Sequence, residues 1–353
     1  MAFKLTDFNA LQRAAFDTII DVRAPLEFAE DHLPGAINLP VLSDAERARV
    51  GTIYVQDSPF KARKLGAALV ARNAAGHLEN TLAEKDESWR PLLYCWRGGQ
   101  RSGSFASILS QIGWRVETLD GGYRSYRRVV VDFLYERAFP AQVFLLDGNT
   151  GTAKSEVLRL LPALGVQVLD LEEMAGHRGS ALGGQGTQPS QKAFESKLAA
   201  SIAALDPARP VLIEAESSRI GRINLPPQLF GAMRASPRIE IVAPISVRAA
   251  YLCRAYRDLT SNEEALVARL RRLVRIQGHA RVDAWVELAQ QGAFPELAQE
   301  LMEHHYDPRY GKKRPKPPAS SLKADDLTPE GVRRLAEAVA EAVSQLQTAR
   351  ISG

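Results

Sequence analysis

A strand, a glycine-rich loop and a helix follow one another directly at two places in the chain, and this succession constrains the fold most. The first is RPLLYCWRGGQRSGSFASILSQIG, residues 90–113, and the second is QVFLLDGNTGTAKSEVLRLLPALG, residues 142–165. Short apolar runs alternate with helical patterns around both segments, which indicates parallel sheets covered by helices. The sequence therefore predicts an α/β fold with two such sheets.

The chain of 353 residues has room for about two domains. The strand–helix pattern restarts near Phe139 and Pro140, so we expect one domain over residues 1–139 and another over 140–353. After Val247 the second domain becomes helical and charged. The stretch TPEGVRRLAEAVAEAVSQLQ predicts a closing amphipathic helix.

The cysteines and the N-terminal residues bear on the compartment. Only Cys95 and Cys253 are present, so no disulfide framework is expected. The N-terminus lacks the basic and then apolar build of a signal peptide, and no apolar run approaches the roughly 20 residues that span a bilayer. We expect a soluble, cytoplasmic protein with no membrane partner, in which Cys95 stays a free thiol.

Cys95 ends the first predicted strand and begins an unusual loop. Gly98 and Gly99 let the backbone curl so that N–H groups point inward, and a helix N-terminus with Arg97 or Arg101 adds positive charge. Such surroundings favour a thiolate, the nucleophilic form of cysteine. We predict catalytic roles for Cys95, Arg97, Gly98, Gly99 and Arg101.

The loop YCWRGGQRS resembles the active loop of rhodanese domains, which carry sulfur as a cysteine persulfide. Their N-terminal signature is matched by Asp21, Arg23, Glu27, His32, Pro34, Gly35, Ala36 and Asn38. The resemblance implies a rhodanese-like parallel-sheet domain with the transferred atom on Cys95, and structural roles for Asp21 and His32. Five residues separate the cysteine from the arginine here, whereas a common rhodanese loop has four. Phosphatase-like loops share the longer form, which can hold a phosphate-like oxyanion.

GNTGTAKS lies between a strand and a helix, the context that a phosphate-binding P-loop requires. Lys154 would supply a positive charge, and Ser155 a hydroxyl ligand for Mg²⁺ if a metal is present. Ala153 replaces the second glycine of the pattern; a positive φ would disfavour its methyl group, whereas a helix-like backbone would accept it. The predicted phosphate- or diphosphate-binding residues are Gly148, Asn149, Thr150, Gly151, Thr152, Ala153, Lys154 and Ser155.

Two further loops follow predicted strands of this P-loop NTPase-like domain. PVLIEAESSRIGRINLP carries carboxylates that resemble the acidic strand end facing a P-loop, and HRGSALGG is rich in glycine. Because ligands gather at the carboxyl ends of parallel strands, both loops are candidates for substrate or metal contact. The candidates are Arg178, Ser180, Glu214, Glu216 and Arg219. The six histidines are scattered, and no certain metal site is assigned.

The whole chain resembles the tRNA 2-selenouridine synthase family. The stretches that carry this resemblance are APLEFAEDHLPGAINLPVLSDAERARVGT, YCWRGGQRS, GNTGTAKSEVL, HRGSALGG, IEAESSRIGRINLP and HHYDPRYGKK. The resemblance implies a transferase that first places the geranyl group of geranyl diphosphate on the sulfur of wobble 2-thiouridine in tRNA. Selenium from selenophosphate then replaces the sulfur and gives 2-selenouridine. On this interpretation the P-loop binds geranyl diphosphate and the Cys95 loop handles selenophosphate.

The same resemblance implies the partners, which are tRNA with wobble 2-thiouridine and the synthase that supplies selenophosphate. Geranyl diphosphate and selenophosphate would be co-substrates, and no firmly bound cofactor is expected apart from optional Mg²⁺. Net charge is only +4, but RLRRLVRIQGHAR concentrates arginine at roughly helical spacing that could follow an RNA backbone. The tRNA-binding candidates are Arg269, Arg271, Arg272, Arg275 and Arg281; Trp96, Tyr123 and Tyr310 are candidates for stacking on an unstacked base.

Two other interpretations remain open. The first is a rhodanese- or phosphatase-like enzyme that transfers sulfur or phosphoryl groups and carries a regulatory nucleotide-binding P-loop domain. It predicts nucleotide binding and phosphoester hydrolysis without RNA. The second is an RNA-binding scaffold with an inert rhodanese domain, in which Cys95→Ala would change only local packing.

Overall fold

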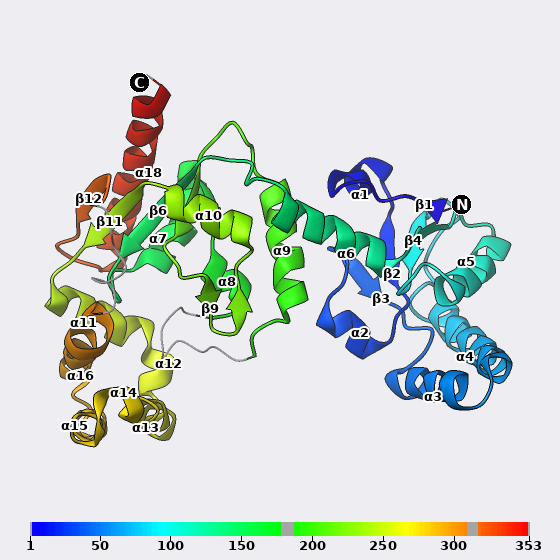
Figure 1. Cartoon of the computed structure of the whole chain (residues 1–353), viewed down its shortest axis with the longest axis horizontal. Coiled ribbons are helices and arrows are strands. Elements are labelled where there is room, and N and C mark those ends of the chain that lie inside the picture. Colours follow the sequence, from blue (N-terminus) through cyan, green and yellow to red (C-terminus); the bar gives the residue numbers. More distant parts are fainter. Residues whose placement is uncertain (1, 178–186, 309–316, 352–353) are drawn as a thin grey trace. The chain divides into compact units, whose positions relative to one another are not determined.

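The computed structural model describes residues 2–177, 187–308 and 317–351. They form two compact units, Met1–Ala138 with Pro189–Ala204 and Phe139–Gln188 with Leu205–Gly353 (Figure 1). The chain first passes from one unit to the other next to the predicted boundary at residue 139. Residues 189–204, however, group with the first unit, although the single predicted boundary assigned them to the second domain.

The first unit is built on a five-stranded parallel sheet of order β1-β5-β4-β2-β3. The strands are β1 (Ala2–Phe3), β2 (Thr18–Asp21), β3 (Ala36–Asn38), β4 (Pro91–Tyr94) and β5 (Glu117–Leu119). Every residue of the central strand β4 is buried, as expected where helices cover both faces of a parallel sheet. The strand therefore delivers the residue that follows it, Cys95, to the carboxyl edge of the sheet.

Helices complete the first unit. They are α1 (Asn9–Ala14), α2 (Pro25–Glu30), α3 (Asp44–Gln56), α4 (Pro59–Glu79), α5 (Gln100–Ile112), α6 (Tyr123–Val131), the π-helix η1 (Asp132–Glu136) and α9 (Gln191–Ala203). Ser43 begins α3 in a capping box with Glu46, and Ser58 caps α4. The apolar faces of α4 and α5 meet the sheet in a core that contains Ile20, Leu93 and Phe105.

The second unit has a five-stranded parallel sheet of order β12-β11-β6-β8-β7 and a separate antiparallel pair, β9 and β10. The strands are β6 (Val143–Gly148), β7 (Gln167–Leu169), β8 (Val211–Glu214), β9 (Arg219–Ile220), β10 (Ile223–Asn224), β11 (Arg238–Val242) and β12 (Ser320–Lys323). The central strand β6 is buried throughout and leads into the predicted P-loop.

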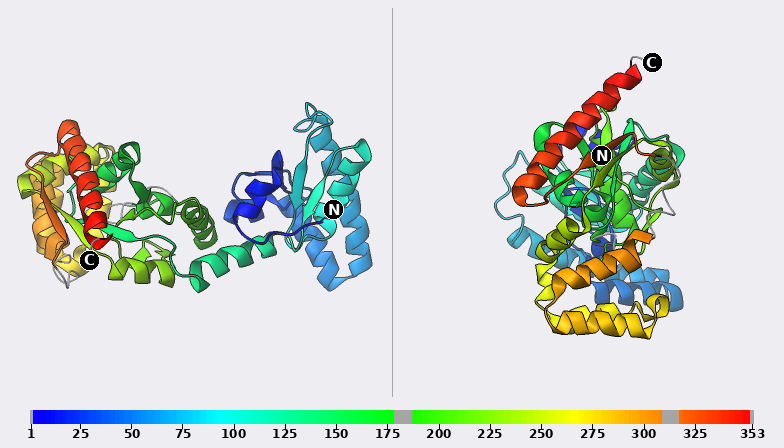
Figure 2. Two further views of the ribbon diagram at one scale, coloured as in Figure 1. Left: turned by 90° about the horizontal axis from the view of Figure 1, so that it is seen from above. Right: turned by 90° about the vertical axis from the view of Figure 1, so that its left-hand side faces the viewer.

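The helices of the second unit include α7 (Lys154–Leu160), the 3-10 helix η2 (Leu161–Leu164), α8 (Leu171–Ala175), α10 (Pro227–Ala235) and α18 (Pro329–Ile351). Figure 2 shows the closing helix α18, in red, from two further directions. One core joins this helix to α7 and the sheet through Val339, Val157 and Phe144. No helix in the described part of the chain is both long and apolar enough to cross a membrane.

The charged helical region follows β11 as a series of short helices. They are α11 (Ile245–Ala255), α12 (Arg257–Thr260), α13 (Glu263–Arg271), α14 (Val274–Gln277), α15 (His279–Gln290), α16 (Phe294–Leu301) and the π-helix η3 (Met302–Tyr306). The fully buried Trp285 lies in their own apolar core. The arginine-rich stretch 269–281 thus spans three helices, and Gly278 with φ of 81° separates the last two. Its arginines, predicted at roughly helical spacing, therefore lie on three successive short helices and the turns between them and not on one continuous helix.

Candidate functional site

The Cys95 thiol lies at the end of β4, buried but surrounded by hydrogen-bond donors. The Gly99 N–H and the Ser102 hydroxyl each donate to its Sγ at 3.3 Å. Burial alone raises the pKa of this thiol, but the bonds from Ser102 and Gly99 and the positive charge of Arg101 outweigh burial and lower it. A lowered pKa favours the nucleophilic thiolate at neutral pH.

The backbone of the Cys95 loop is fixed against the turn before α6. The Tyr123 N–H donates to the Cys95 carbonyl at 2.8 Å, and the Arg124 N–H donates to the Trp96 carbonyl at 3.2 Å. Gly122 has a φ of 59°, and a Cβ there would lie 2.3 Å from the Cys95 carbonyl oxygen. Only glycine allows this close approach. The turn at residues 119–122 therefore supports the thiol loop through these backbone hydrogen bonds.

The two loop arginines differ in their surroundings. Arg101 lies on α5 and donates from Nη1 to Glu27 Oε2 at 2.8 Å, and Glu27 also pairs with Arg47 at 2.9 Å. Burial raises the pKa of Glu27, but these two guanidinium groups lower it further than burial raises it. Glu27 therefore stays ionised and neutralises part of the positive charge of Arg101. Arg97 is exposed.

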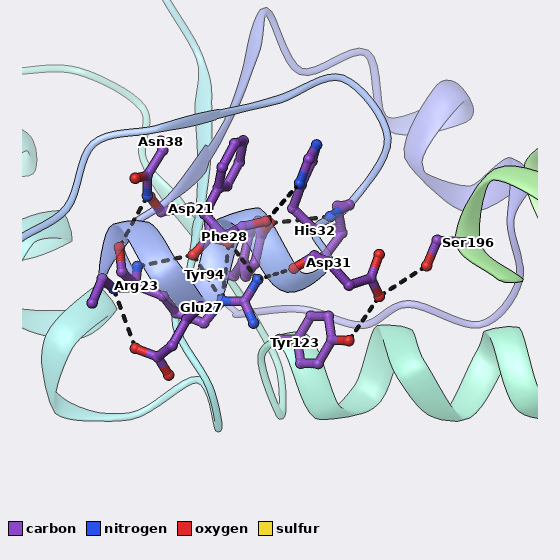
Figure 3. A network of polar contacts seen from close by, with 12 residues as sticks. Asp21, Arg23, Glu27, Phe28, Asp31, His32, Asn38, Tyr94, Tyr123 and Ser196 are labelled. Carbon is purple, nitrogen blue, oxygen red and sulfur yellow. Dashed lines mark hydrogen bonds and ion pairs between the residues drawn. The ribbon is translucent and has the colours of Figure 1, made fainter. Parts of the chain in front are cut away.

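Three of the remaining signature residues, Asp21, Arg23 and Asn38, belong to a largely buried polar network, shown in Figure 3. Arg23 donates to Asp21 at 2.6 Å and to the Asp31 carbonyl at 2.6 Å, and both side chains of the Arg23–Asp21 pair are essentially inaccessible. Asp31 accepts from Tyr123 at 2.7 Å and from Ser196 of α9 at 2.9 Å. This network connects β2, α6 and α9 within the first unit, and it shows no contact of Asp21 with the thiol. The predicted structural role of Asp21 agrees with this position.

The second predicted loop, residues 148–155, connects β6 to α7 as expected. Lys154 Nζ donates to the Gly148 carbonyl at 2.8 Å and lies 3.8 Å from Glu214 Oε1, so the ammonium group is held across the loop. Ser155 Oγ donates to Glu172 at 3.3 Å. Arg248 of α11 donates to the carbonyl of Thr150 in this loop at 3.2 Å.

Ala153 has a φ of 61°, which is the left-handed conformation and not the helix-like one. A non-glycine residue there costs about 1–2 kcal/mol. Its methyl group, however, is 3% exposed and belongs to the core beneath α7. Burial of one methyl group contributes about 0.8 kcal/mol, and a glycine would add entropy to the unfolded chain. Strain and packing thus nearly cancel, which explains why alanine is tolerated in place of glycine.

Three carboxylates gather at the same edge of the second sheet. Glu214 ends β8, Glu216 follows it and Glu172 lies on α8, with oxygens that all lie within 4.8 Å of one another. Burial, reinforced by like charge, raises the pKa of Glu172 and Glu214 to about 8 and that of Glu216 to about 7. The sequence predicted Glu214 and Glu216 but not Glu172. Glu172 lies far from the other two in the chain, so no local pattern indicated that it joins them.

This carboxylate cluster suits a hard divalent cation. Mg²⁺ prefers oxygen ligands and is commonly held by one or two carboxylates together with substrate phosphates. Glu214 Oε2 is buried without a hydrogen-bond partner among the described residues. The donors that fit Mg²⁺ are therefore Glu172, Glu214, Glu216 and the Ser155 hydroxyl, beside the loop predicted to hold phosphate.

Comparison with known proteins assigns both units. A family model described as the tRNA 2-selenouridine synthase AAA domain matches residues 141–339, more than half of the chain, and a rhodanese-like domain model matches residues 5–128. The chain belongs to the tRNA 2-selenouridine synthase family. The predicted order of a rhodanese-like domain and then a P-loop-like α/β domain is confirmed.

Curated members of this family are similar to the chain over most of its length. The tRNA 2-selenouridine synthase of Aeromonas salmonicida is 34% identical and covers 77% of this chain and 78% of its own. Those of Psychromonas ingrahamii and Nitrosomonas europaea are 34% and 37% identical and cover 69% and 65% of this chain. The chain spans 66% and 61% of the length of these last two relatives, slightly less than two thirds.

Beside the thiol loop of this family member lies a hollow of about 510 Å³. It is lined by Trp96, Tyr123, Arg124 and Arg128, among others. The Trp96 and Tyr123 rings stack with centroids 5.3 Å apart, but Tyr123 is 2% exposed. Trp96 is half-buried and is therefore the better placed of the two for stacking on a base. Tyr310, the third aromatic candidate, lies outside the described residues.

The other predicted contacts are scattered. Arg178 and Ser180 lie outside the described residues. Arg219 is exposed on β9 and donates to the Gly221 carbonyl at 2.8 Å. Among the candidate tRNA-binding arginines, Arg271, Arg272, Arg275 and Arg281 are exposed and Arg269 is half-buried. Arg271 pairs with Asp283 at 3.2 Å, so part of its charge is already balanced.

Proposed function

We propose that the protein converts wobble 2-thiouridine of tRNA into 2-selenouridine by two successive group transfers. Membership of the family supports tRNA selenouridine formation. The observation that carries the proposal is the pairing of two different loops in one chain, each at the carboxyl end of a central parallel strand. One presents a thiol with lowered pKa, and the other presents a lysine within a phosphate-binding loop.

The first transfer suits the loop at Lys154. The thiocarbonyl sulfur of 2-thiouridine attacks C1 of geranyl diphosphate, the C1–O bond breaks, and diphosphate leaves with the bonding electron pair. The ring then loses its N3 proton to water, which gives the neutral S-alkyl nucleoside. The loop amides and Lys154 stabilise this leaving charge. Mg²⁺, if bound by the Glu172, Glu214 and Glu216 carboxylates and Ser155, would neutralise more of it.

The second transfer suits the loop at Cys95. The selenium of selenophosphate attacks the same ring carbon, and the C–S bond breaks so that the geranyl thiolate leaves with the bonding electron pair. Attack of water on phosphorus then breaks the P–Se bond, releases phosphate and leaves selenium on the ring. The Cys95 loop offers amide donors and a helix N-terminus to the phosphate part of selenophosphate, beside a polarised thiol. The hollow at Trp96, with the exposed Arg124 and Arg128, offers a stacking surface and positive charge for the nucleoside and its backbone.

A phosphatase-like reaction at Cys95 is the competing function, because the loop length favours it. Its requirement for a guanidinium group directed at phosphate is poorly met, since Arg101 is paired with Glu27 through two hydrogen bonds. Such an enzyme would release phosphate from a phosphoester in the absence of RNA.

The test is incubation of 2-thiouridine tRNA with geranyl diphosphate and then selenophosphate, followed by mass spectrometry of the nucleosides. We expect the Lys154→Ala protein to lose geranylation. It should still convert tRNA that already carries the geranyl group into 2-selenouridine tRNA. Cys95→Ser should spare geranylation and abolish selenation. Lys323→Ala, at an exposed lysine of β12, should match the unaltered protein in both steps. The proposal would be rejected if Lys154→Ala lost selenation and Cys95→Ser lost geranylation.

A further inference from the structure

An apolar cavity lies within the second unit among the helices that follow β11. Leu259, Leu266, Leu297 and Leu301 are buried around it, and the half-buried Phe294 completes the apolar lining. Of the residues assigned to phosphate, metal or thiol chemistry, Thr150 alone is among its lining residues. The cavity is therefore not part of the polar machinery, and its lining fits a hydrocarbon ligand.

The cavity borders the phosphate-binding loop. Thr150 of that loop is one of its lining residues, and so is Leu252 of α11. The next loop residue, Gly151, packs so closely on this helix that a Cβ there would lie 3.1 Å from Leu252 Cγ. Arg248, one turn before Leu252, donates to the Thr150 carbonyl and pairs with Asp307 at 2.8 Å. The polar loop and the apolar cavity thus share residues and are held together by α11.

The size of the cavity restricts its occupant. Its volume is about 70 Å³, and a single buried water needs roughly 10–15 Å³ of such space. Room for a handful of water-sized groups suits a slender chain better than a fused ring system. A purine base would also need polar partners, which this lining hardly offers.

We propose that this cavity holds the hydrocarbon chain of an allylic diphosphate whose diphosphate lies in the loop at residues 148–155. The inference rests on the proposed function for the identity of the donor, and it assigns the selection of chain length to Leu259, Leu266, Leu297 and Ala298. A diphosphate in the loop and a chain in the cavity would together fix the allylic end of the donor near Thr150. Inorganic diphosphate or a nucleotide could use only the loop.

Calorimetric binding to the full chain tests this inference without any transfer reaction. The ligands are inorganic diphosphate, ATP, GTP and the dimethylallyl, geranyl and farnesyl diphosphates. The unaltered protein should bind geranyl diphosphate about tenfold or more tightly than inorganic diphosphate, because each buried methylene adds affinity. Equal affinity for the two would overturn the inference.

Filling the cavity gives the second test. Ala298 lies on α16 and lines the cavity, so Ala298→Phe or the milder Ala298→Leu should remove most of the advantage of geranyl over dimethylallyl diphosphate. Affinity for inorganic diphosphate should stay unchanged, which also shows that the variant is folded. The matched control is Ala235→Phe, at an exposed alanine that ends α10.

The outcomes separate the two proposals. If Ala298→Phe and Ala298→Leu keep the full preference for geranyl diphosphate, the chain binds elsewhere and the cavity assignment is wrong. If the preference depends on Ala298 but no geranyl group ever reaches 2-thiouridine, the cavity assignment stands and the proposed function fails. Tight binding of ATP or GTP that Ala298→Phe leaves unaffected, without chain-dependent binding, would instead favour a nucleotide site.

Discussion

Cys95 is 4% exposed, yet its sulfur is surrounded by donors and not only by hydrocarbon. The donors matter because burial by itself would raise the pKa of the thiol and suppress the thiolate. Ser102 is the leading group among those that lower it, ahead of the Gly99 amide and Arg101. Ser102 is thus a positioning and activating residue that the loop motif alone does not reveal, although it directly follows Arg101 in the sequence.

We therefore expect Ser102→Ala to raise the pKa of Cys95. A group with a lowered pKa keeps its charge to a lower pH, so removal of the hydroxyl should move the appearance of the thiolate to higher pH. The ultraviolet absorbance of the thiolate during a pH titration measures this shift, with Cys95→Ser as the blank for the contribution of Cys253.

The pH dependence of selenation provides a second measurement of the same change. Its rising limb should move to higher pH in Ser102→Ala, whereas the limb for geranylation should not move. A Ser102→Thr variant, which keeps the hydroxyl, should restore the original position. If the titrations of the unaltered protein, Ser102→Ala and Ser102→Thr coincide, the Ser102 hydroxyl does not lower the pKa of Cys95.

The residues that the sequence predicted are those whose neighbours are local. The loops at Cys95 and Lys154 and their flanking strands and helices follow from local patterns, and the structure has them at the predicted places. Glu172 completes the second site from a distant part of the chain, so nothing in the loop sequence indicated it. Glu27 was noted only as a match to the rhodanese signature, and its pairing with Arg101 became visible in the structure. The positive φ at Ala153 is likewise set by the turn around it and not by its own residue type.

At the scale of elements, α9 lies in the predicted second domain but groups by its contacts with the first unit. Its sequence reads as an ordinary helix of the second domain, but its buried Glu195 pairs with Arg127 of α6 and accepts from Tyr135 at 2.8 Å. A buried carboxylate needs such partners, and they lie about 60 residues away in the first unit. A long-range ion pair of this kind leaves no periodic signal, which is why a single domain boundary was predicted.

The same pair makes a prediction about α9. Glu195→Ala leaves Arg127 without its partner and should weaken the attachment of the helix by about 2 kcal/mol, less than the roughly 3–5 kcal/mol of a fully buried pair because Arg127 is partly exposed. That corresponds to roughly 30-fold faster amide exchange in residues 191–203, which hydrogen–deuterium exchange with mass spectrometry measures.

The matched control lies on the same helix. Lys192 pairs with Glu30 at 2.7 Å, but both side chains are exposed, so Lys192→Ala should cost about 0–1 kcal/mol. Exchange in α10, in the other unit, should be unchanged in both variants. Equal exchange of α9 in Glu195→Ala and Lys192→Ala would show that the buried pair does not hold the helix.

At the scale of the whole molecule, the net charge is only +4, but exposed arginines form one group in each unit. Arg124 and Arg128 lie on α6 beside the hollow at Trp96, in the first unit. In the second unit, Arg272 is the C-cap residue that follows α13 and Arg275 lies on α14. If one tRNA is handled by both chemical loops, its backbone should contact both groups, and each contact should release counterions.

The salt dependence of tRNA binding tests this division. We expect neutralisation of either pair, Arg124→Gln with Arg128→Gln or Arg272→Gln with Arg275→Gln, to flatten the plot of log affinity against log salt concentration by about 0.7–0.9 per lost phosphate contact. The variant with all four changes should show the sum, because the pairs lie in different units. Arg333→Gln on α18, where Arg333 already pairs with Glu330 at 2.6 Å, is the control. If only one pair changes the slope beyond this control, the tRNA backbone contacts one unit alone, and the nucleoside must reach the other loop without phosphate contacts there.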